Sequence, residues 1–298
     1  MKRLVLRVLA VIAALVVALV AFVVIRSQLA LHQRWHIDEA ALVIPADPAT
    51  VERGRHIAIT RGCGECHGVD LGGHAIVDSP HTIGRIAAPN LTPGHGSATA
   101  AFSPADWERA IRHGIAPDGR GLLFMPILDF AGLSDADTAD LIAYLEQVPP
   151  VDHEMPPSVV GPLGRVLFAF GKLPLTEARL VDHHAAHSRG MVVGPTAESG
   201  RNLVQGCIGC HGEHLSGGAV PGLPPSFPKA ANLTPDPTGI GAWVKADFYR
   251  ALREGRRPDG SAIDPFMPWK ALGHFYDVEL VALWAYLRSL PARPHGQR

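Results

Sequence analysis

The sequence is poor in aromatic residues, in charged residues and in cysteine. Aromatic side chains make up 6% and charged side chains 18% of the 298 residues, and the formal net charge is −1. A chain without a basic excess gives no sign of a nucleic-acid partner, and we expect none. The chain also lacks a glycine-rich dinucleotide fingerprint and a P-loop, so it shows no machinery for oxidising an organic substrate by itself.

Strand patterns are also scarce, because apolar and polar residues show no obvious alternation along the chain. The 31 Gly and 26 Pro exceed average usage and indicate many loops between short helices. The length leaves room for two domains of about 100 residues each, together with connecting segments. We therefore expect a mainly α protein with two small domains.

The N-terminal segment contains the one long apolar run of the chain. Residues 8–25 are all apolar, with three basic residues before them and Arg26 after them. This length fits one membrane-spanning helix, so we predict a transmembrane anchor over residues 1–26 and a linker over 27–47. A cleaved signal peptide is the alternative, although signal peptides usually have a shorter apolar region. Both interpretations leave the basic end in the cytoplasm and export the remainder.

The four cysteines fall into two motifs of the same form, Cys-x-x-Cys-His. They consist of Cys63, Cys66 and His67, and of Cys207, Cys210 and His211. This is the attachment sequence of c-type haem, in which two thiols bind the vinyl groups and the histidine reaches the iron. A redox dithiol would not require a histidine in both motifs, and a zinc site would have to join halves about 140 residues apart. We therefore predict two covalently bound haem c groups.

The chain repeats itself at an offset of 141 to 144 residues. Asn-Leu-Thr-Pro occurs at positions 90 and 232, Pro-Asp-Gly at 117 and 258, and Phe-Met-Pro at 124 and 266. Such an internal repeat indicates two copies of one structural unit. We place these haem domains at residues 48–150 and 194–298, with a proline-rich connection over 151–193.

Local signals predict the helices of each copy. Ser103 and Asp106 form a capping box for a middle helix, and Phe102 and Trp107 are placed to form a hydrophobic staple at its start. This helix should end near Gly114. Each copy closes with a helix that carries one apolar stripe containing a tyrosine.

The opening helices contain Gly54 and Gly200, and a glycine in a helix costs about 1 kcal/mol relative to alanine. We infer that the closing helix crosses closely there, with its tyrosine over the glycine.

Each copy resembles a class I cytochrome c domain in the order of its motifs: opening helix, Cys-x-x-Cys-His, Asn-Leu-Thr-Pro, middle helix, Met loop and closing helix. The whole arrangement is similar to the diheme and triheme cytochrome subunits of membrane-bound dehydrogenases, although a third haem motif is absent. The resemblance implies a mainly α fold of two tandem haem domains, with a dehydrogenase as a possible redox partner.

Two of the five methionines occupy matched positions. Met125 and Met267 follow their haem histidines by 58 and 56 residues, and each stands between Phe and Pro. A thioether is a soft iron ligand that raises the reduction potential, so we predict Met125 paired with His67 and Met267 paired with His211. The alternative is that both are ordinary core methionines.

Histidine is abundant, and most of the histidines in one repeat have no counterpart in the other. We expect surface or loop positions for His74, His81, His95, His113, His214 and His274. His183, His184 and His187 form a cluster in the connection, which indicates either a metal or proton site or a solvated linker. The linker interpretation is favoured, since no cysteine or second histidine cluster completes a site.

The connection and the charges add two expectations. The apolar run at residues 166–170 should pack across both haem domains or, alternatively, lie at the membrane surface. Residues 48–150 carry a net charge of −5 and residues 194–298 a net charge of +2. This difference predicts different partners for the two haems.

The sequence therefore predicts a diheme electron carrier rather than an enzyme. It would lie at the inner membrane, with its haem domains in the periplasm, and pass electrons from a membrane or periplasmic donor to a respiratory acceptor. A diheme peroxidase is the alternative, since such enzymes also have two attachment motifs. The Phe-Met-Pro loop in both copies favours the carrier, because it would close both irons.

Overall fold

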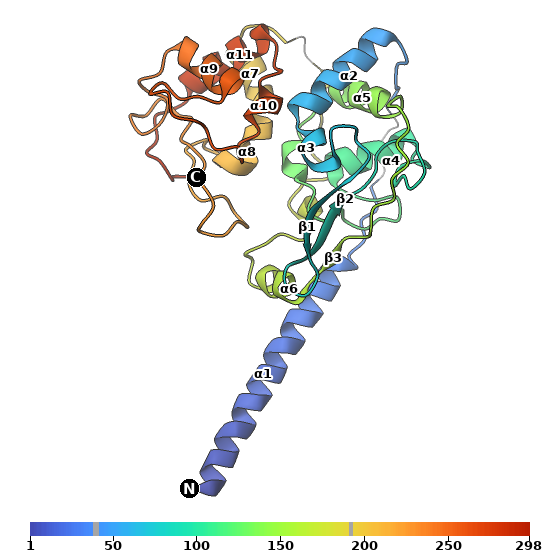
Figure 1. Cartoon of the computed structure of the whole chain (residues 1–298), viewed down its shortest axis with the longest axis vertical. Helices are drawn as coiled ribbons and strands as arrows, with labels where there is room; N and C mark the ends of the chain where they lie inside the picture. The colour runs from blue at the N-terminus through green and yellow to red at the C-terminus, as the bar shows by residue number, and fades with distance from the viewer. Residues whose placement is uncertain (38–41, 191–192) are drawn as a thin grey trace.

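The computed structural model describes residues 1–37, 42–190 and 193–298. Two mainly helical bodies lie side by side, and a long N-terminal helix, α1 (Lys2–Leu31), extends away from the first of them (Figure 1). The first body contains residues of the first repeat, and the second contains residues of the second repeat. The predicted mainly α architecture is therefore confirmed.

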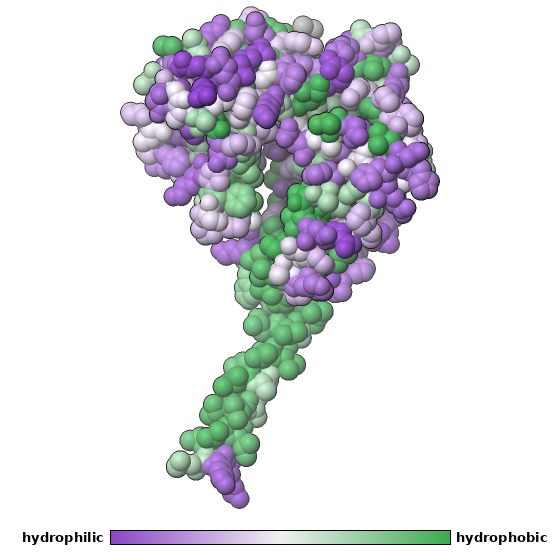
Figure 2. All heavy atoms as spheres, in the orientation of Figure 1, coloured by the Kyte–Doolittle hydropathy of each residue, from purple (hydrophilic) through white to green (hydrophobic). Residues whose placement is uncertain are grey.

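Helix α1 is almost entirely exposed. Its side chains are apolar along most of its length, and hydrophilic residues appear at its free end (Figure 2). Within the described residues, it is the one helix that is long and apolar enough to cross a membrane, a property that signal sequences share. Val23, Ser27 and Ala30 are its only buried residues, and all three lie near the end that joins the first body.

The first body is built around two crossing helices. Helix α2 (Pro48–Thr60) begins at Asp47, whose carboxylate accepts hydrogen bonds from the Ala49 and Thr50 amides at 3.1 Å. It packs on the closing helix α5 (Asp135–Leu145), and the core between them includes Leu141 and Ile142. The other helical segments are α3 (Cys63–His67), α4 (Pro104–Glu108), η1 (Arg109–His113) and η2 (Ile127–Asp129).

The second body repeats this crossing with α7 (Ala197–Leu203) and α11 (Asp277–Ser289). Its remaining helices are α8 (Gln205–His211), α9 (Lys245–Glu254) and α10 (Trp269–Leu272). Its core is a separate cluster that includes Phe248, Leu280 and Leu283. Each of the two bodies therefore has a hydrophobic core of its own.

The predicted reason for the two helix glycines is confirmed. A Cβ added to Gly54 would lie 1.9 Å from the Asp140 carbonyl oxygen and 2.8 Å from Cβ of Tyr144. A Cβ added to Gly200 would lie 2.1 Å from the Ala282 oxygen and 2.7 Å from Cβ of Tyr286. Only glycine lets the opening and closing helices approach this closely.

The predicted start and end of the middle helix are also confirmed. Ser103 and Asp106 form a capping box, and the Phe102 and Trp107 rings meet with their centroids 5.3 Å apart. Gly114 ends the helix in the left-handed conformation, with φ at 65°. The last turn, η1, is a π-helix, which local sequence patterns did not indicate.

A small antiparallel sheet was not anticipated. Strands β1 (His74–Ser79) and β2 (Gly84–Ala88) form a hairpin in the loop after the first haem motif, and β3 (Val159–Val160) pairs with β2. The corresponding loop of the second copy has only an isolated bridge between Gly218 and Ala230. Four prolines occur between these two residues, and proline cannot donate to a strand ladder.

The proline-rich connection contains helix α6 (Pro162–Ala169) and a short turn, η3 (Glu177–Arg179). The expectation that residues 166–170 pack across both haem domains is wrong. Helix α6 packs instead on α1 and β2, and Phe168 joins a small core with Ala30 and Leu175. The apolar run is used to fasten the N-terminal helix to the first body.

Candidate haem sites

The two Cys-x-x-Cys-His motifs form short helical turns, α3 and the end of α8, which follow the opening helices. Gly68 and Gly212 end these turns with φ at 84° and 82°, values that favour glycine. All four cysteines are free of disulfides. Burial raises the pKa of the Cys63 and Cys207 thiols to about 12, whereas reactive redox dithiols have lowered values.

The motif histidines are oriented by backbone carbonyls. Nδ1 of His67 lies 2.8 Å from the Pro89 oxygen, and Nδ1 of His211 lies 2.7 Å from the Ala231 oxygen. A donating Nδ1–H leaves Nε2 as the lone-pair nitrogen, the form that binds a metal. Burial lowers the pKa of both histidines, which favours the same neutral form. Two thiols and one such imidazole in each turn fit haem c.

The Asn-Leu-Thr-Pro repeats hold these carbonyls in place, a role that the sequence did not indicate. The Asn90 side chain donates to the Val151 oxygen at 2.7 Å, and its own oxygen accepts from the Thr92 amide at 2.8 Å. In the same way, the Asn232 side chain donates to the Arg293 oxygen, and its own oxygen accepts from the Thr234 amide. Each asparagine ties the loop beside the haem histidine to the chain that follows the closing helix.

The candidate distal ligands lie in equivalent loops. Met125 is half-buried against the first core, which Cys63 also contacts, and Met267 is half-buried against the second core, which Cys207 also contacts. A tight turn follows each methionine, since the carbonyl of Met125 accepts from the Ile127 amide and that of Met267 from the Trp269 amide. The two sulfurs thus belong to corresponding parts of the two domains. Of the other methionines, Met191 lies outside the described residues.

The two domains meet where the second attachment turn packs on the Met loop of the first domain. Helix α8 contacts η2, which begins two residues after Met125. A Cβ added to Gly209 would lie 2.8 Å from Oδ1 of Asp129, and one added to Gly206 would lie 2.6 Å from Nη1 of Arg61. These glycines let two side chains of the first domain touch the backbone of the second haem turn.

Asp129 is the titratable group at the centre of this contact. Burial, and then the negative charge of Glu177, raise the pKa of Asp129 to about 7, whereas the Gly209 amide and Arg61 oppose the increase. The native protein therefore keeps this proton up to about pH 7, while the unfolded chain releases it near the ordinary carboxyl pKa of 3.8. The contribution of Asp129 to stability is thus greatest at low pH and falls as the pH rises from about 4 to 7.

We predict that Asp129→Asn makes stability less dependent on pH. At pH 8 the variant should gain on the order of 2 kcal/mol, because an uncharged amide no longer has to be held as a buried anion. At pH 4 the two proteins should unfold at similar temperatures. Thermal unfolding of both proteins at the two pH values measures this, and an equal difference at both values would contradict the assignment.

A second contact between the domains is a buried hydrogen bond between two side chains. Nε2 of His56 lies 2.8 Å from Oε2 of Glu279, and both side chains are about one-tenth exposed, at 11% and 8%. The His56 ring also stacks on Tyr276, with centroids 4.0 Å apart and an interplanar angle of 8°. Helix α2 of the first domain is thereby fixed to the start of α11 in the second.

The expectations for two groups of histidines need correction. Five of the six unmatched histidines are exposed, but His113 is fully buried. Its Nδ1 lies 3.0 Å from Nδ1 of His183, and the His187 ring lies 6.0 Å away between centroids. The solvated-linker interpretation therefore fails for His183 and His187 and holds for the exposed His184.

This histidine cluster fastens the connection to the first domain. Burial, followed by the charges of His183 and His187, lowers the pKa of His113 to about 4, so its ring is neutral at pH 7. Trp35 packs edge-on against His183 at 6.2 Å. Among the residues whose positions are described, no three His, Cys, Asp or Glu side chains are arranged to hold a metal ion.

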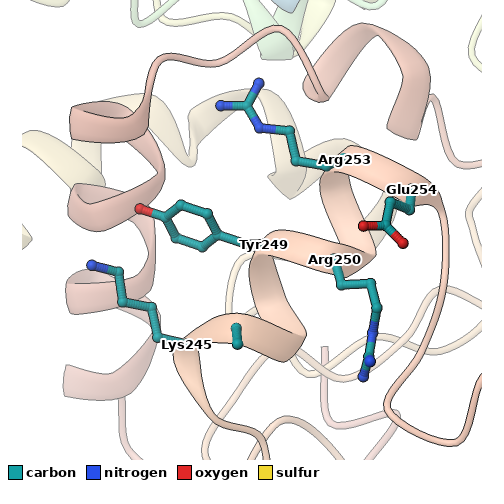
Figure 3. A pocket seen from close by; sticks show the side chains of 6 residues that line it. Lys245, Tyr249, Arg250, Arg253 and Glu254 are labelled. Carbon is teal, nitrogen blue, oxygen red and sulfur yellow. The ribbon is translucent and has the colours of Figure 1, made fainter.

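The surface of α9 has a shallow hollow of about 550 Å³, seen in Figure 3. Lys245, Tyr249, Arg250 and Arg253 line it, together with Glu254. The Lys245 ammonium lies 5.4 Å from the centre of the Tyr249 ring. Two of its cations are paired with carboxylates, Arg250 with Asp247 at 2.7 Å and Arg253 with Asp277 at 3.0 Å, so the hollow has no clear excess of positive charge.

Comparison with known proteins places this fold and these motifs in one family. The family model for cytochrome c matches residues 51–149 and 197–291, which together exceed half of the chain. The chain belongs to the cytochrome c family. It has two cytochrome c domains and carries two covalently bound haem c groups, which confirms the predicted fold class and cofactors.

Several characterised proteins are similar over most of the chain. The cytochrome c subunit of a quinone-dependent alcohol dehydrogenase from Gluconacetobacter polyoxogenes is 31% identical over 85% of this chain and 58% of its own length. The gluconate 2-dehydrogenase cytochrome c subunit of Pantoea cypripedii is 30% identical, over 85% of this chain and 62% of its own. A diheme cytochrome c-type protein of Cereibacter sphaeroides is 26% identical over 80% of this chain and 86% of its own length. The chain thus spans about six-tenths of the two dehydrogenase subunits.

Proposed function

We propose that this chain receives electrons from a dehydrogenase and passes them, through two haems in series, to a respiratory acceptor. The observation that carries the proposal is the duplicated site, in which each domain combines an attachment turn, a carbonyl-oriented histidine and a half-buried methionine. Bound haem iron supplies the one-electron step by cycling between its ferrous and ferric states. The protein holds, shields and tunes that iron.

In this proposal, the residues have the following roles. Cys63 and Cys66 attach the first haem and Cys207 and Cys210 the second; His67 with Met125, and His211 with Met267, bind the two irons. The carbonyls of Pro89 and Ala231 keep each imidazole in its metal-binding form. A methionine sulfur favours the reduced iron, and so raises its potential into the range of a carrier.

Electrons would cross between the domains at the contact of η2 with α8. The chain from Met125 to Asp129 leads from one proposed iron ligand to the turn that attaches the other haem. Within the first domain, Arg61 holds the end of η2 by donating to the Asp129 carbonyl at 3.3 Å. A packed backbone contact supports transfer better than a solvent gap, because it brings the two redox centres close together. The dehydrogenase names of the relatives support a dehydrogenase as donor.

The electron donor and acceptor would dock on different domains. The first repeat has a net charge of −5, whereas the second has a net charge of +2. An acidic partner would be steered toward the second domain and a basic partner toward the first.

We also propose that α1 is retained as a membrane anchor, with the haem domains in the periplasm. The end of α1 is part of the folded protein, because Ser27 and Ala30 are buried and Arg165 donates to the Ser27 hydroxyl at 2.9 Å. Cleavage near Ala30 would remove this packing. The basic residues before the apolar run favour a cytoplasmic N-terminus.

A diheme peroxidase is the second candidate, since it also attaches two haems. It would require one iron with an open or openable position, whereas both domains have a methionine in the same loop. The duplicated methionine favours the carrier.

The test is to replace each methionine by alanine. Met125→Ala and Met267→Ala should each remove the far-red sulfur-to-iron absorption of one haem and lower its potential by more than about 100 mV, a fraction of the ~0.8 V range that axial ligands span. The other haem should keep both its band and its potential, so each variant is the control for the other. Met155→Ala should change neither haem. A variant that keeps both bands would show that another residue binds that iron, and would reopen the case for a peroxidase.

A further inference from the structure

Helix α6 and Phe170 expose an apolar face beside the membrane anchor. Gly164, Phe168 and Ala169 are buried against the protein, whereas Leu163, Val166 and Phe170 are 45%, 39% and 54% exposed. The exposed residues are three and four positions apart, so they lie on one side of the helix. Apolar side chains gathered on an outer face indicate a partner.

The position of this face along α1 indicates what the partner is. At 1.5 Å per residue, Phe22 lies about 21 Å above Val8, where the apolar run begins. The hydrocarbon core of a bilayer is about 30 Å thick, so Phe22 lies inside its outer boundary when the run crosses it. The Phe170 ring is 6.3 Å from the Phe22 ring between centroids. Phe170 cannot be far from the acyl chains if Phe22 is among them.

The charges around this face fit a lipid surface as well. No acidic residue occurs between Glu154 and Glu177, a segment that contains Arg165 and Lys172. The chain before Asp38 is also free of acidic residues, and Arg26 lies over the Phe22 ring at 5.9 Å. Basic side chains at this level can reach anionic headgroups while apolar neighbours enter the layer beneath. The first haem domain, in contrast, has a net charge of −5.

We propose that α6 lies in the interfacial layer of the bilayer beside α1, with Leu163, Val166 and Phe170 among the lipids, and that it forms a second membrane contact which sets the orientation of the first haem domain. The proposal rests on the proposed retention of α1 as an anchor. It adds that the connection itself binds lipid. Because Arg165 is held by Ser27, the two contacts act as one rigid unit.

Added tryptophans in the full-length, haem-loaded chain test this proposal. Val166→Trp and Phe170→Trp would be reconstituted in nanodiscs of phosphatidylcholine and phosphatidylglycerol, with and without bromine near the headgroup end of the acyl chains. Bromine quenches tryptophan only at contact. The emission that each substitution adds over the wild-type protein is the quantity compared. All substituted positions are exposed, so the core packing is left intact.

Two controls separate this proposal from the anchor. Phe22→Trp reports on α1 itself, and Val244→Trp, at a 61% exposed position of the second domain, reports on a surface away from the bilayer. We expect bromine to remove added emission at positions 22, 166 and 170 and to leave position 244 unchanged. Quenching of the tryptophan at position 22, without quenching of those at positions 166 and 170, would overturn the proposal and leave the anchor intact. Absence of quenching at 22 would overturn the anchor and, with it, the lipid contact of α6.

The other possible occupant of this face is a second copy of the chain. In that case, positions 166 and 170 would be protected from bromine, and Val166→Lys would convert a dimer into a monomer in dilute nanodisc samples. That result would also overturn the lipid proposal.

Discussion

A variant with both Cys63 and Cys66 replaced by alanine is expected to carry one haem instead of two. The two thioether bonds hold the haem covalently, and His67 alone provides a single bond to an iron that is free to dissociate. The second domain has its own core and its own proposed set of ligands, so its haem should remain. Denaturing gel electrophoresis with haem staining, together with the mass of the intact chain, measures the number of bound haems.

The mirror variant, with Cys207 and Cys210 replaced, is the matched control and should retain the haem of the first domain. Comparison of the two gives the separate absorption spectrum of each haem. Retention of two covalent haems in either variant would refute the assignment of the attachment residues.

The largest effect on stability is expected from Gly54→Ala. Alanine is the better helix former by about 1 kcal/mol, so an unpacked helix would gain from the change. Here the added methyl group would lie 1.9 Å from the backbone oxygen of Asp140, which a flexible side chain cannot relieve. The two helices must separate, at a cost of about 3 kcal/mol or more, and the melting temperature of this domain should fall by more than about 10 °C.

Gly132→Ala is the control in the same domain. The nearest atom to its added methyl group would be Cγ of Gln205 at 3.6 Å, an ordinary contact. Circular dichroism during heating, followed at both the backbone and the haem bands, compares the two variants. Equal melting temperatures would contradict the crossing of α2 and α5 at Gly54.

Features that depend on neighbouring residues were predictable from the sequence. The capping box at Ser103, the end of the middle helix at Gly114 and the close crossing at Gly54 all follow from local rules, and Gly200 repeats the close crossing in the second copy. The two haem motifs belong to the same group, because their chemistry lies within five consecutive residues. The assignment of Met125 and Met267 to the irons stays a prediction.

Features that depend on distant residues were not predictable. His113 was expected at the surface, because nothing near it in sequence shows that His183, 70 residues later, would cover it. Gly209 occupies a variable position of the haem motif, and nothing near it in sequence shows that its missing side chain admits Asp129 from the other domain. Helix α6 was assigned to the wrong partner for the same reason. An apolar run shows that a surface will be covered and does not specify by what.

With α1 retained as the proposed membrane anchor, its continuity with the folded protein would determine how the proposed carrier meets its partners. The helix runs to Leu31 without a break, and soon after it the Trp35 amide donates to the Gly119 oxygen at 2.8 Å. A carrier on a flexible tether moves through a large volume above the membrane and samples many orientations relative to it. A carrier on a stiff stalk in a bilayer presents the same sides at a constant height. It then meets other membrane proteins by lateral diffusion in two dimensions. Only its rotation about the membrane normal still has to match the partner.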